Sequence, residues 1–250
     1  MININRVGEK NYNSFGSEMI IIKHINASNI DVYFPKYNYV AKNKQYSKFK
    51  KGNIGCPYEP NIYGGYLGEG EYKCKINGNV TKCYKTWYSM LRRCYDNKNQ
   101  KPTYIDCTVC EEWYNFQNFA KWYEENYYEI PNEKMHLDKD ILFKGNKIYS
   151  PQTCIFAPQR INDLFVKSDK ARGKYPIGVY YYKPTNKFKV QCNINSKRIG
   201  LGYYNNIEEA FSVYKEFKEN YIKEIADEYK NIIPIELYNA MYNYEVEITD

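Results

Sequence analysis

Hydrophobic and polar positions follow two different periods in the last third of the chain. Across residues 179–204, three short runs alternate between apolar and polar side chains, as the strands of a half-buried sheet do. Across 207–221 the apolar residues instead recur every three or four positions, which predicts an amphipathic helix. Asn205 is the expected N-cap of this helix, with Glu208 as its capping-box partner. The pattern predicts a three-stranded sheet with a helix on one face.

The first seventy residues carry a different pattern. Short β-type runs at 19–22 and 30–34 are separated by Asn, Ser and Gly, which favours a small N-terminal sheet or barrel. The glycine-rich stretch 57–71 that follows is typical of a flexible linker. These residues therefore predict a β module, residues 1–70, that is separate from the rest of the chain.

The middle of the chain predicts helices and then a mixed element. Apolar spacing favours helices at 84–95 and from Phe116 to Tyr123, with their aromatic side chains in a core. Residues 135–162 then suit a strand, a loop, a second strand and a short helix. Another short helix is expected near 232–244, after Pro234. The fold class is α+β, in three modules: 1–70, 71–168 and 169–250.

Charge favours a polyanionic partner. The net charge is +7, and from Lys167 to Arg198 nine basic residues stand against one acid, Asp169. A second basic cluster, free of acids, contains Lys48 and Lys50 within residues 36–51. Two basic regions far apart in the sequence suit double-stranded DNA held at two places, although a generally lysine-rich chain would give a similar count.

Composition also bears on the cellular compartment of the protein and on whether its cysteines bind zinc. The chain has no long apolar run, and residues 1–10 lack the hydrophobic core of a signal peptide, so neither secretion nor a membrane span is indicated. We expect the eight cysteines to be cytosolic thiols, and without a heptad seam we expect a monomer. Cys107 and Cys110 have the spacing of a zinc knuckle but lack a second tight pair, so buried free thiols are favoured over zinc.

The C-terminal motifs resemble a known DNA-binding family. They read Gly178-Val-x-Tyr, Lys187-Phe, Leu201-Gly-Tyr-Tyr and Glu208-Glu-Ala-Phe-x-x-Tyr. Residues 175–221 are similar to the AP2-type DNA-binding domain in the divergent form found in phage proteins. The resemblance implies that the outward side chains of the sheet read the major groove. By position these are Tyr180, Tyr182, Lys189, Gln191, Asn193 and Arg198.

The middle motifs resemble a nuclease family. They read Trp87-x-x-Met-x-x-Arg-Cys-Tyr95, Val109-Cys-x-Glu-Trp113, Leu137-Asp-Lys-Asp140 and Gly145-Asn-x-x-Tyr-Ser-Pro151. Residues 84–165 are similar to the phage branch of the HNH nucleases, which bind one divalent ion on a ββα element. The resemblance implies Mg²⁺ or Mn²⁺, which carboxylate and amide oxygens suit.

The same resemblance implies roles for five residues. Asp138, Asp140 and Asn162 would hold the metal, and Asn146 would order the loop. No histidine occupies the position of the general base, so by position that role falls on Asp138 or Asp140. His136 shares a strand face with Asp138, and it either takes the base role or is an ordinary strand residue.

Two functions remain open from the sequence. The first is a metal-dependent endonuclease of phage origin, of a homing or nicking type, acting in the host bacterial cytoplasm. The second is a DNA-binding regulator or interference protein that retains an inactive nuclease fold. Asp and Asn at loop starts serve structural turns as well as catalysis, so these residue types alone do not separate the two.

Overall fold

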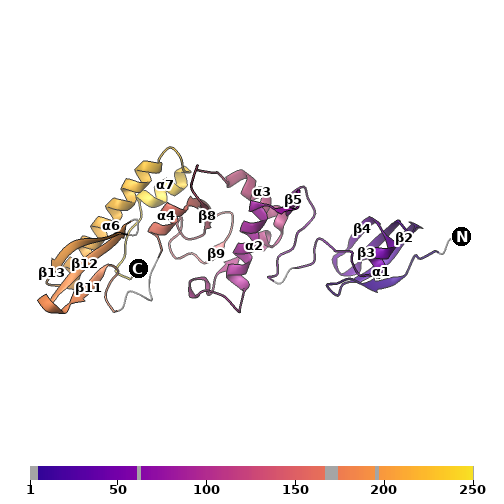
Figure 1. Cartoon of the computed structure of the whole chain (residues 1–250), viewed down its shortest axis with the longest axis horizontal. Helices are drawn as coiled ribbons and strands as arrows, with labels where there is room; N and C mark the ends of the chain where they lie inside the picture. The colour runs from indigo at the N-terminus through magenta and orange to yellow at the C-terminus, as the bar shows by residue number, and fades with distance from the viewer. Residues whose placement is uncertain (1–4, 61–62, 167–173, 195–196, 250) are drawn as a thin grey trace. The chain divides into compact units, whose positions relative to one another are not determined.

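The chain folds into α+β structure in two compact units. The structure is a computed structural model that describes residues 5–60, 63–166, 174–194 and 197–249. Unit 1 is Met1–Glu125 and unit 2 is Asn126–Asp250 (Figure 1). The expected module boundary at 70/71 falls inside unit 1, and the one at 168/169 lies outside the described residues. The division into three modules therefore stays a prediction.

Unit 1 begins with a four-stranded antiparallel sheet in the order β1-β2-β3-β4. The strands are β1 (Lys10–Tyr12), β2 (Glu18–Asn26), β3 (Asn29–Phe34) and β4 (Tyr39–Lys44), and α1 (Tyr46–Lys50) follows. Burial alternates along β3, where Ile30, Val32 and Phe34 are buried, and Phe49 of α1 completes the core. The predicted N-terminal β element is confirmed as a sheet.

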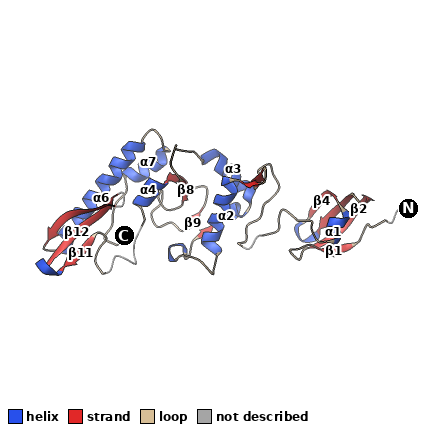
Figure 2. Cartoon of the chain, in the orientation of Figure 1, coloured by secondary structure: helices blue, strands red, loops and turns tan. Residues whose placement is uncertain are grey.

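The second part of unit 1 is built on two helices, which Figure 2 shows in blue. They are α2 (Lys82–Tyr95) and α3 (Phe116–Asn126), both close to their predicted bounds. Short elements precede and join them: β5 (Lys75–Ile76), β6 (Asn79–Val80), η2 (Pro102–Tyr104), β7 (Thr108–Val109) and η3 (Glu111–Tyr114). The indole N–H of Trp87 donates to the carbonyl of Trp113 at 2.7 Å. This bond lies among buried aromatic rings, so the predicted aromatic core is confirmed.

The expected flexible linker is wrong for residues 63–70. Tyr66 exchanges backbone hydrogen bonds with this part of unit 1, donating to the carbonyl of Tyr114 at 2.8 Å and accepting from Phe116 N–H at 2.9 Å. A β carbon on Gly65 would meet the side chains of Leu91 and Trp87. The glycines that suggested flexibility instead let the backbone lie directly on the helices.

Unit 2 opens with the element that resembles a ββα motif. Strand β8 (Met135–Asp138) pairs antiparallel with β10 (Ile155–Pro158), and α4 (Gln159–Leu164) follows directly. The connecting loop contains the short strand β9 (Ile148–Tyr149). Ile155 and Ala157 of β10 are buried with Ile161 of α4. The expected strand, loop, strand and helix are therefore confirmed, although β8 ends at Asp138.

The C-terminal sheet has the antiparallel order β11-β12-β13, drawn in orange in Figure 1. Its strands are β11 (Val179–Tyr182), β12 (Lys187–Ile194) and β13 (Lys197–Tyr204), and η4 (Lys183–Thr185) joins the first two. The inner face, led by Val179, Val190 and Cys192, packs against Ala210 and Tyr214 of helix α6 (Ile207–Tyr229). This confirms the three-stranded sheet with a helix on one face.

Helix α6 belongs to two hydrophobic cores. Its first half packs on the sheet, whereas Ile222, Ile225 and Ala226 of its second half pack against the β8, β10 and α4 element. Helix α7 (Ile235–Tyr242) starts after Pro234, as expected, and adds Leu237 and Met241 to the second core.

The start of α6 differs from the expectation by one residue. The N-cap is Asn206, whose side-chain oxygen accepts from the backbone N–H of Glu209 at 2.7 Å. The predicted cap, Asn205, lies one position too early. Two adjacent asparagines offer the same capping chemistry, and the extended backbone at Asn206 (φ −130°, ψ 165°) decides between them.

A β-bulge in β13 sets which residues face outward. Val190 pairs with Gly202 but Gln191 pairs with Gly200, so Leu201 is the extra residue on β13. Gly202 has a φ of +120°, a backbone conformation that residues with a side chain rarely adopt. Because of this bulge, Tyr203 lies beside Lys189 on the outer face and Tyr204 lies beside Phe188 on the inner face.

The contact between Gly178 and α6 gives a test of the sheet-on-helix packing. Gly178 has a φ of +76°, and a β carbon there would overlap the ring of Tyr214. We expect Gly178→Ala to lower the free energy of unfolding by about 2–4 kcal/mol, from backbone strain and overpacking. Chemical denaturation measures this. Gly200→Ala is the control, because its β carbon meets nothing within 4 Å; an equal loss in both variants would contradict the packing.

Candidate nucleic-acid interface

The outer face of the C-terminal sheet gathers aromatic, basic and amide side chains. We call it the tyrosine–lysine face. It comprises Tyr180, Tyr182, Lys187, Lys189, Gln191, Asn193, Arg198 and Tyr203. The strand alternation that buries Val179, Val190 and Cys192 against α6 turns these eight side chains the other way. All six sheet residues that the sequence predicted for DNA binding thus share one face.

The side chains of the tyrosine–lysine face lie in rows across the strands. Tyr180, Lys189 and Tyr203 are direct cross-strand neighbours, and the Lys189 ammonium lies 5.9 Å from the centre of the Tyr203 ring. The Tyr182 ring is 5.4 Å from that of Tyr203. Farther along β12, Asn193 pairs with Arg198. The face therefore presents an aromatic and cationic end and an amide and guanidinium end.

Two members of the face were absent from the sequence prediction. Lys187 pairs with Tyr182 and lies on the same side of β12 as Lys189. Strict alternation along β12 therefore already indicated that Lys187 faces outward. Tyr203 is 46% exposed, but strict alternation along β13 would have placed it inward. Only the glycines that flank Leu201 hinted at the bulge that turns it outward.

Charge is segregated within this part of the chain. From Lys174 to Asn206 there are six basic residues and no acid, whereas Glu208 and Glu209 open α6 immediately afterwards. Three other residues of the predicted basic stretch, Lys167, Lys170 and Arg172, lie outside the described residues. A cationic sheet face without carboxylates attracts a partner that carries phosphate groups and repels a basic partner.

The predicted second basic site is less concentrated. Lys48 and Lys50 are both exposed on α1, but they flank the buried Phe49 two positions apart, so they do not face the same side. Lys50 also lies 3.6 Å from a carboxylate oxygen of Glu9. A DNA contact at these lysines stays a prediction.

The predicted catalytic residues occupy the β8–β10 element. Asp138 ends β8, and its Oδ1 accepts from the backbone N–H groups of Asp140 and Ile141, each at 2.8 Å. Burial, followed by the neighbouring Asp140 carboxylate, raises the pKa of Asp138 to about 6. Asn146 orders the loop, donating to the carbonyls of Lys139 and Ile148, each at 2.7 Å.

His136 connects the strand to the helix. Its Nε2 lies 2.7 Å from the side-chain oxygen of Gln159, whose amide nitrogen donates to Asp163 at 2.9 Å. The Gln159 oxygen must therefore accept, and His136 Nε2 is the donor. In this arrangement the free lone pair of a neutral His136 is on Nδ1.

Two of the predicted metal ligands already have partners in the fold. The buried Lys139 places its ammonium 3.2 Å from Asp140 Oδ2, and Asp138 already accepts two backbone bonds. Within the described ranges, no three His, Cys, Asp or Glu side chains gather as a metal site would require. Asn162 is half-buried on α4. The metal set of Asp138, Asp140 and Asn162 stays a prediction.

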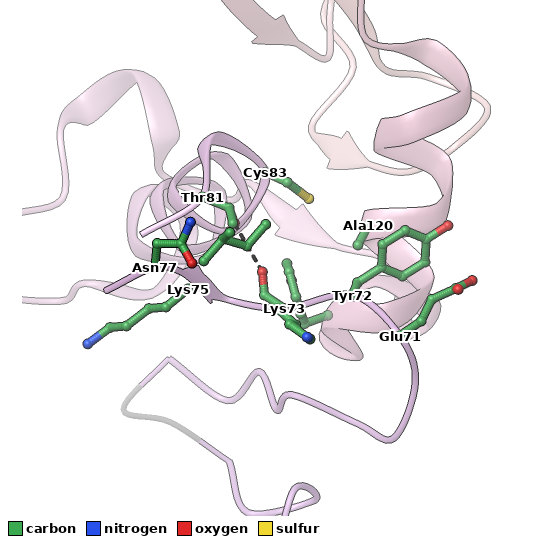
Figure 3. Close-up of a pocket in the computed structure, with 10 residues that line it drawn as sticks. Glu71, Tyr72, Lys73, Lys75, Asn77, Thr81, Cys83 and Ala120 are labelled. Atoms are coloured by element: carbon green, nitrogen blue, oxygen red, sulfur yellow. Dashed lines mark hydrogen bonds between the residues drawn. The ribbon is translucent and has the colours of Figure 1, made fainter. Parts of the chain in front are cut away.

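The described cysteines are thiols that form no disulfide bond. Cys94 and Cys107 are buried, and Cys110 is half-buried at the start of η3. Cys83 lines an open cleft of about 510 Å³ in unit 1, together with Tyr72 and Phe116 (Figure 3). Burial, with a smaller effect of Glu124, raises the pKa of Cys83 to about 12. The cleft therefore offers no thiolate nucleophile near neutral pH.

No helix among the described residues is both long enough and apolar enough to span a membrane.

The raised pKa of Asp138 predicts a pH-dependent stability. The folded state binds this proton more tightly than the unfolded chain, so the contribution to stability is complete below about pH 4 and is lost as the pH rises to about 6. In Asp138→Asn the side-chain oxygen still accepts both backbone bonds, and no charge is buried. We expect this variant to lack that pH dependence and to be more stable at neutral pH by about 1–3 kcal/mol.

Denaturant unfolding of both proteins across this pH range is the measurement. An unchanged profile in the variant would show that Asp138 is ionised normally.

Comparison with known proteins identifies no family for this chain. No family model, curated protein or solved structure matches the chain. A function for this protein must therefore be supported by the tyrosine–lysine face and the β8–β10 element themselves.

Proposed function

We propose that this protein binds double-stranded DNA through the tyrosine–lysine face. The observation that carries the proposal is the alignment of eight polar, aromatic and basic side chains on an acid-free sheet face whose other side is covered by α6. A β-sheet of this kind can enter the major groove and place side chains against base edges.

The side chains of the face fall into two groups: those that can contact phosphates and hold the DNA in position, and those that can contact base edges. Lys187, Lys189 and Arg198 supply positive charge for phosphates. The hydroxyls of the exposed Tyr180 and Tyr203 can donate to phosphate oxygens as well. Gln191 and Asn193 are the amides that can pair with base edges.

A second candidate function is cleavage of the bound duplex, which the resemblance to HNH nucleases implies. Two observations favour it: the order β8, β10 and α4, and the raised pKa of Asp138 beside a second carboxylate. The ion pair of Lys139 with Asp140 favours the other alternative, a DNA-binding regulator without nuclease activity.

Removal of charge from the sheet tests binding. We expect Lys189→Ala combined with Arg198→Ala to weaken binding to mixed-sequence duplexes by about 10-fold or more, and to lower the slope of log affinity against log salt by about 1–2. Fluorescence anisotropy with labelled duplexes over a series of salt concentrations measures both quantities.

A matched control removes the same charge elsewhere in unit 2. Lys223→Ala with Lys230→Ala removes one lysine of α6 and the C-cap lysine that follows the helix. Their ammonium groups lie 5.7 Å from the ring centre of Tyr242 and 5.6 Å from that of Tyr238, respectively. We expect little change in this control. Equal weakening by both pairs would mean that the sheet is not the binding face.

Incubation with supercoiled plasmid in Mg²⁺, Mn²⁺ or EDTA tests cleavage. A nuclease at β8–β10 is expected to nick in the metal-containing reactions only, and to lose this activity in Asp138→Ala with Asp140→Ala. Retarded migration of the plasmid without nicking in any metal would instead support the regulator. Nicking that persists in the double variant would place the activity outside this element.

A further inference from the structure

Gln191 occupies a gap in the side-chain rows of the tyrosine–lysine face. On one side it pairs with Gly200 of β13, and on the other its backbone N–H donates to the carbonyl of Gly178 at 2.9 Å. Neither neighbour has a side chain. The central row of the face therefore consists of one glutamine between two stretches of bare backbone.

The rows on both sides of this gap are filled. Along β12, Lys189 lies in a row with Tyr180 and Tyr203, and Asn193 lies in a row with Arg198. Side chains of the same face are spaced by about 6.7 Å along a strand. The bare backbone beside Gln191 thus forms a slot across the strands, which we call the glycine slot, between two rows in which neighbouring strands carry side chains.

The bulge and the glycine conformations maintain the glycine slot. Leu201 is accommodated as the extra residue, so Gly200, and not a larger residue, lies opposite Gln191. A β carbon on Gly200 would meet no atom within 4 Å, so no packing requirement explains a glycine there. Glycine inside a strand marks a bulge or close approach by a ligand or another backbone, and the positive φ of this bulge is at Gly202, not at Gly200.

We propose that Gln191 recognises adenine through the major-groove edge, with the glycine slot admitting the base. The inference rests on the proposed DNA binding and names the base that the face selects. A glutamine amide donates to adenine N7 and accepts from its N6 amino group, a two-bond match that guanine and the pyrimidines do not offer. Bare backbone on both sides lets the base edge come within hydrogen-bond distance of a side chain of this length.

The test uses three short synthetic duplexes: alternating dA·dT, alternating dG·dC, and alternating dA·dT in which 7-deaza-adenine replaces adenine. The wild-type protein is expected to bind the dA·dT duplex about 10-fold or more tightly than either of the others. The deaza duplex lacks only the N7 acceptor in the major groove, so it separates this contact from a preference for a narrow minor groove.

Three variants locate the effect. Gln191→Ala is expected to bind all three duplexes with the affinity that the wild type shows for the deaza duplex. Gly200→Val keeps Gln191 but fills the glycine slot, and it is expected to lose the same discrimination with its melting temperature retained. Asn239→Ala removes an exposed amide from α7, outside the tyrosine–lysine face, and is expected to keep the discrimination.

The outcomes separate this inference from the proposed function. Equal wild-type binding to all three duplexes, or discrimination that survives in Gln191→Ala, overturns the role of Gln191 while leaving DNA binding intact. Absence of binding to every duplex overturns the proposed function, and the inference with it.

Discussion

The structure of unit 2 depends on one helix that is shared by two cores. Ala210 and Tyr214 pack on the inner face of the C-terminal sheet, and Ile222 and Ile225 pack on the β8–β10 element. A three-stranded sheet of this size has too little apolar surface to be stable without such a cover. Because α6 packs on the inner face, it is the outer face that is left to solvent. The same helix fixes the sheet and the β8–β10 element within one compact unit.

The second constraint is the register of β13. A single extra residue, Leu201, moves Tyr203 to the outer face and Tyr204 to the inner face. A regular strand would have exposed Tyr204 and buried Tyr203, and the aromatic row beside Lys189 would not exist. The Tyr204 hydroxyl instead donates to the carbonyl of Leu201 at 2.8 Å, which holds the bulge from the inside. The outward aromatic row and the hydrogen bond that supports it from the inner face thus come from the same local irregularity.

Local pattern predicted much of this fold. Alternation correctly separated Lys189 and Gln191 from Phe188 and Val190, because one face is buried and the period of a strand is fixed. Alternation failed at Tyr203, because a bulge depends on cross-strand register. The glycine content of residues 63–70 was also misleading, because glycine is as typical of close packing as of flexibility. In the β8–β10 element, the sequence placed Asp138 at a strand end but could not show that the buried Lys139 pairs with Asp140, because that contact depends on the fold of the loop.

The tyrosines of the outer face have a thermodynamic consequence. Tyr180, Tyr182 and Tyr203 are 44%, 38% and 46% exposed, so each keeps a large part of its ring in water before any partner arrives. Covering these rings removes apolar surface from solvent, which lowers the heat capacity of the system. Association through this face would therefore have an enthalpy that becomes more favourable as the temperature rises, a calorimetric signature that a face made only of lysines would lack.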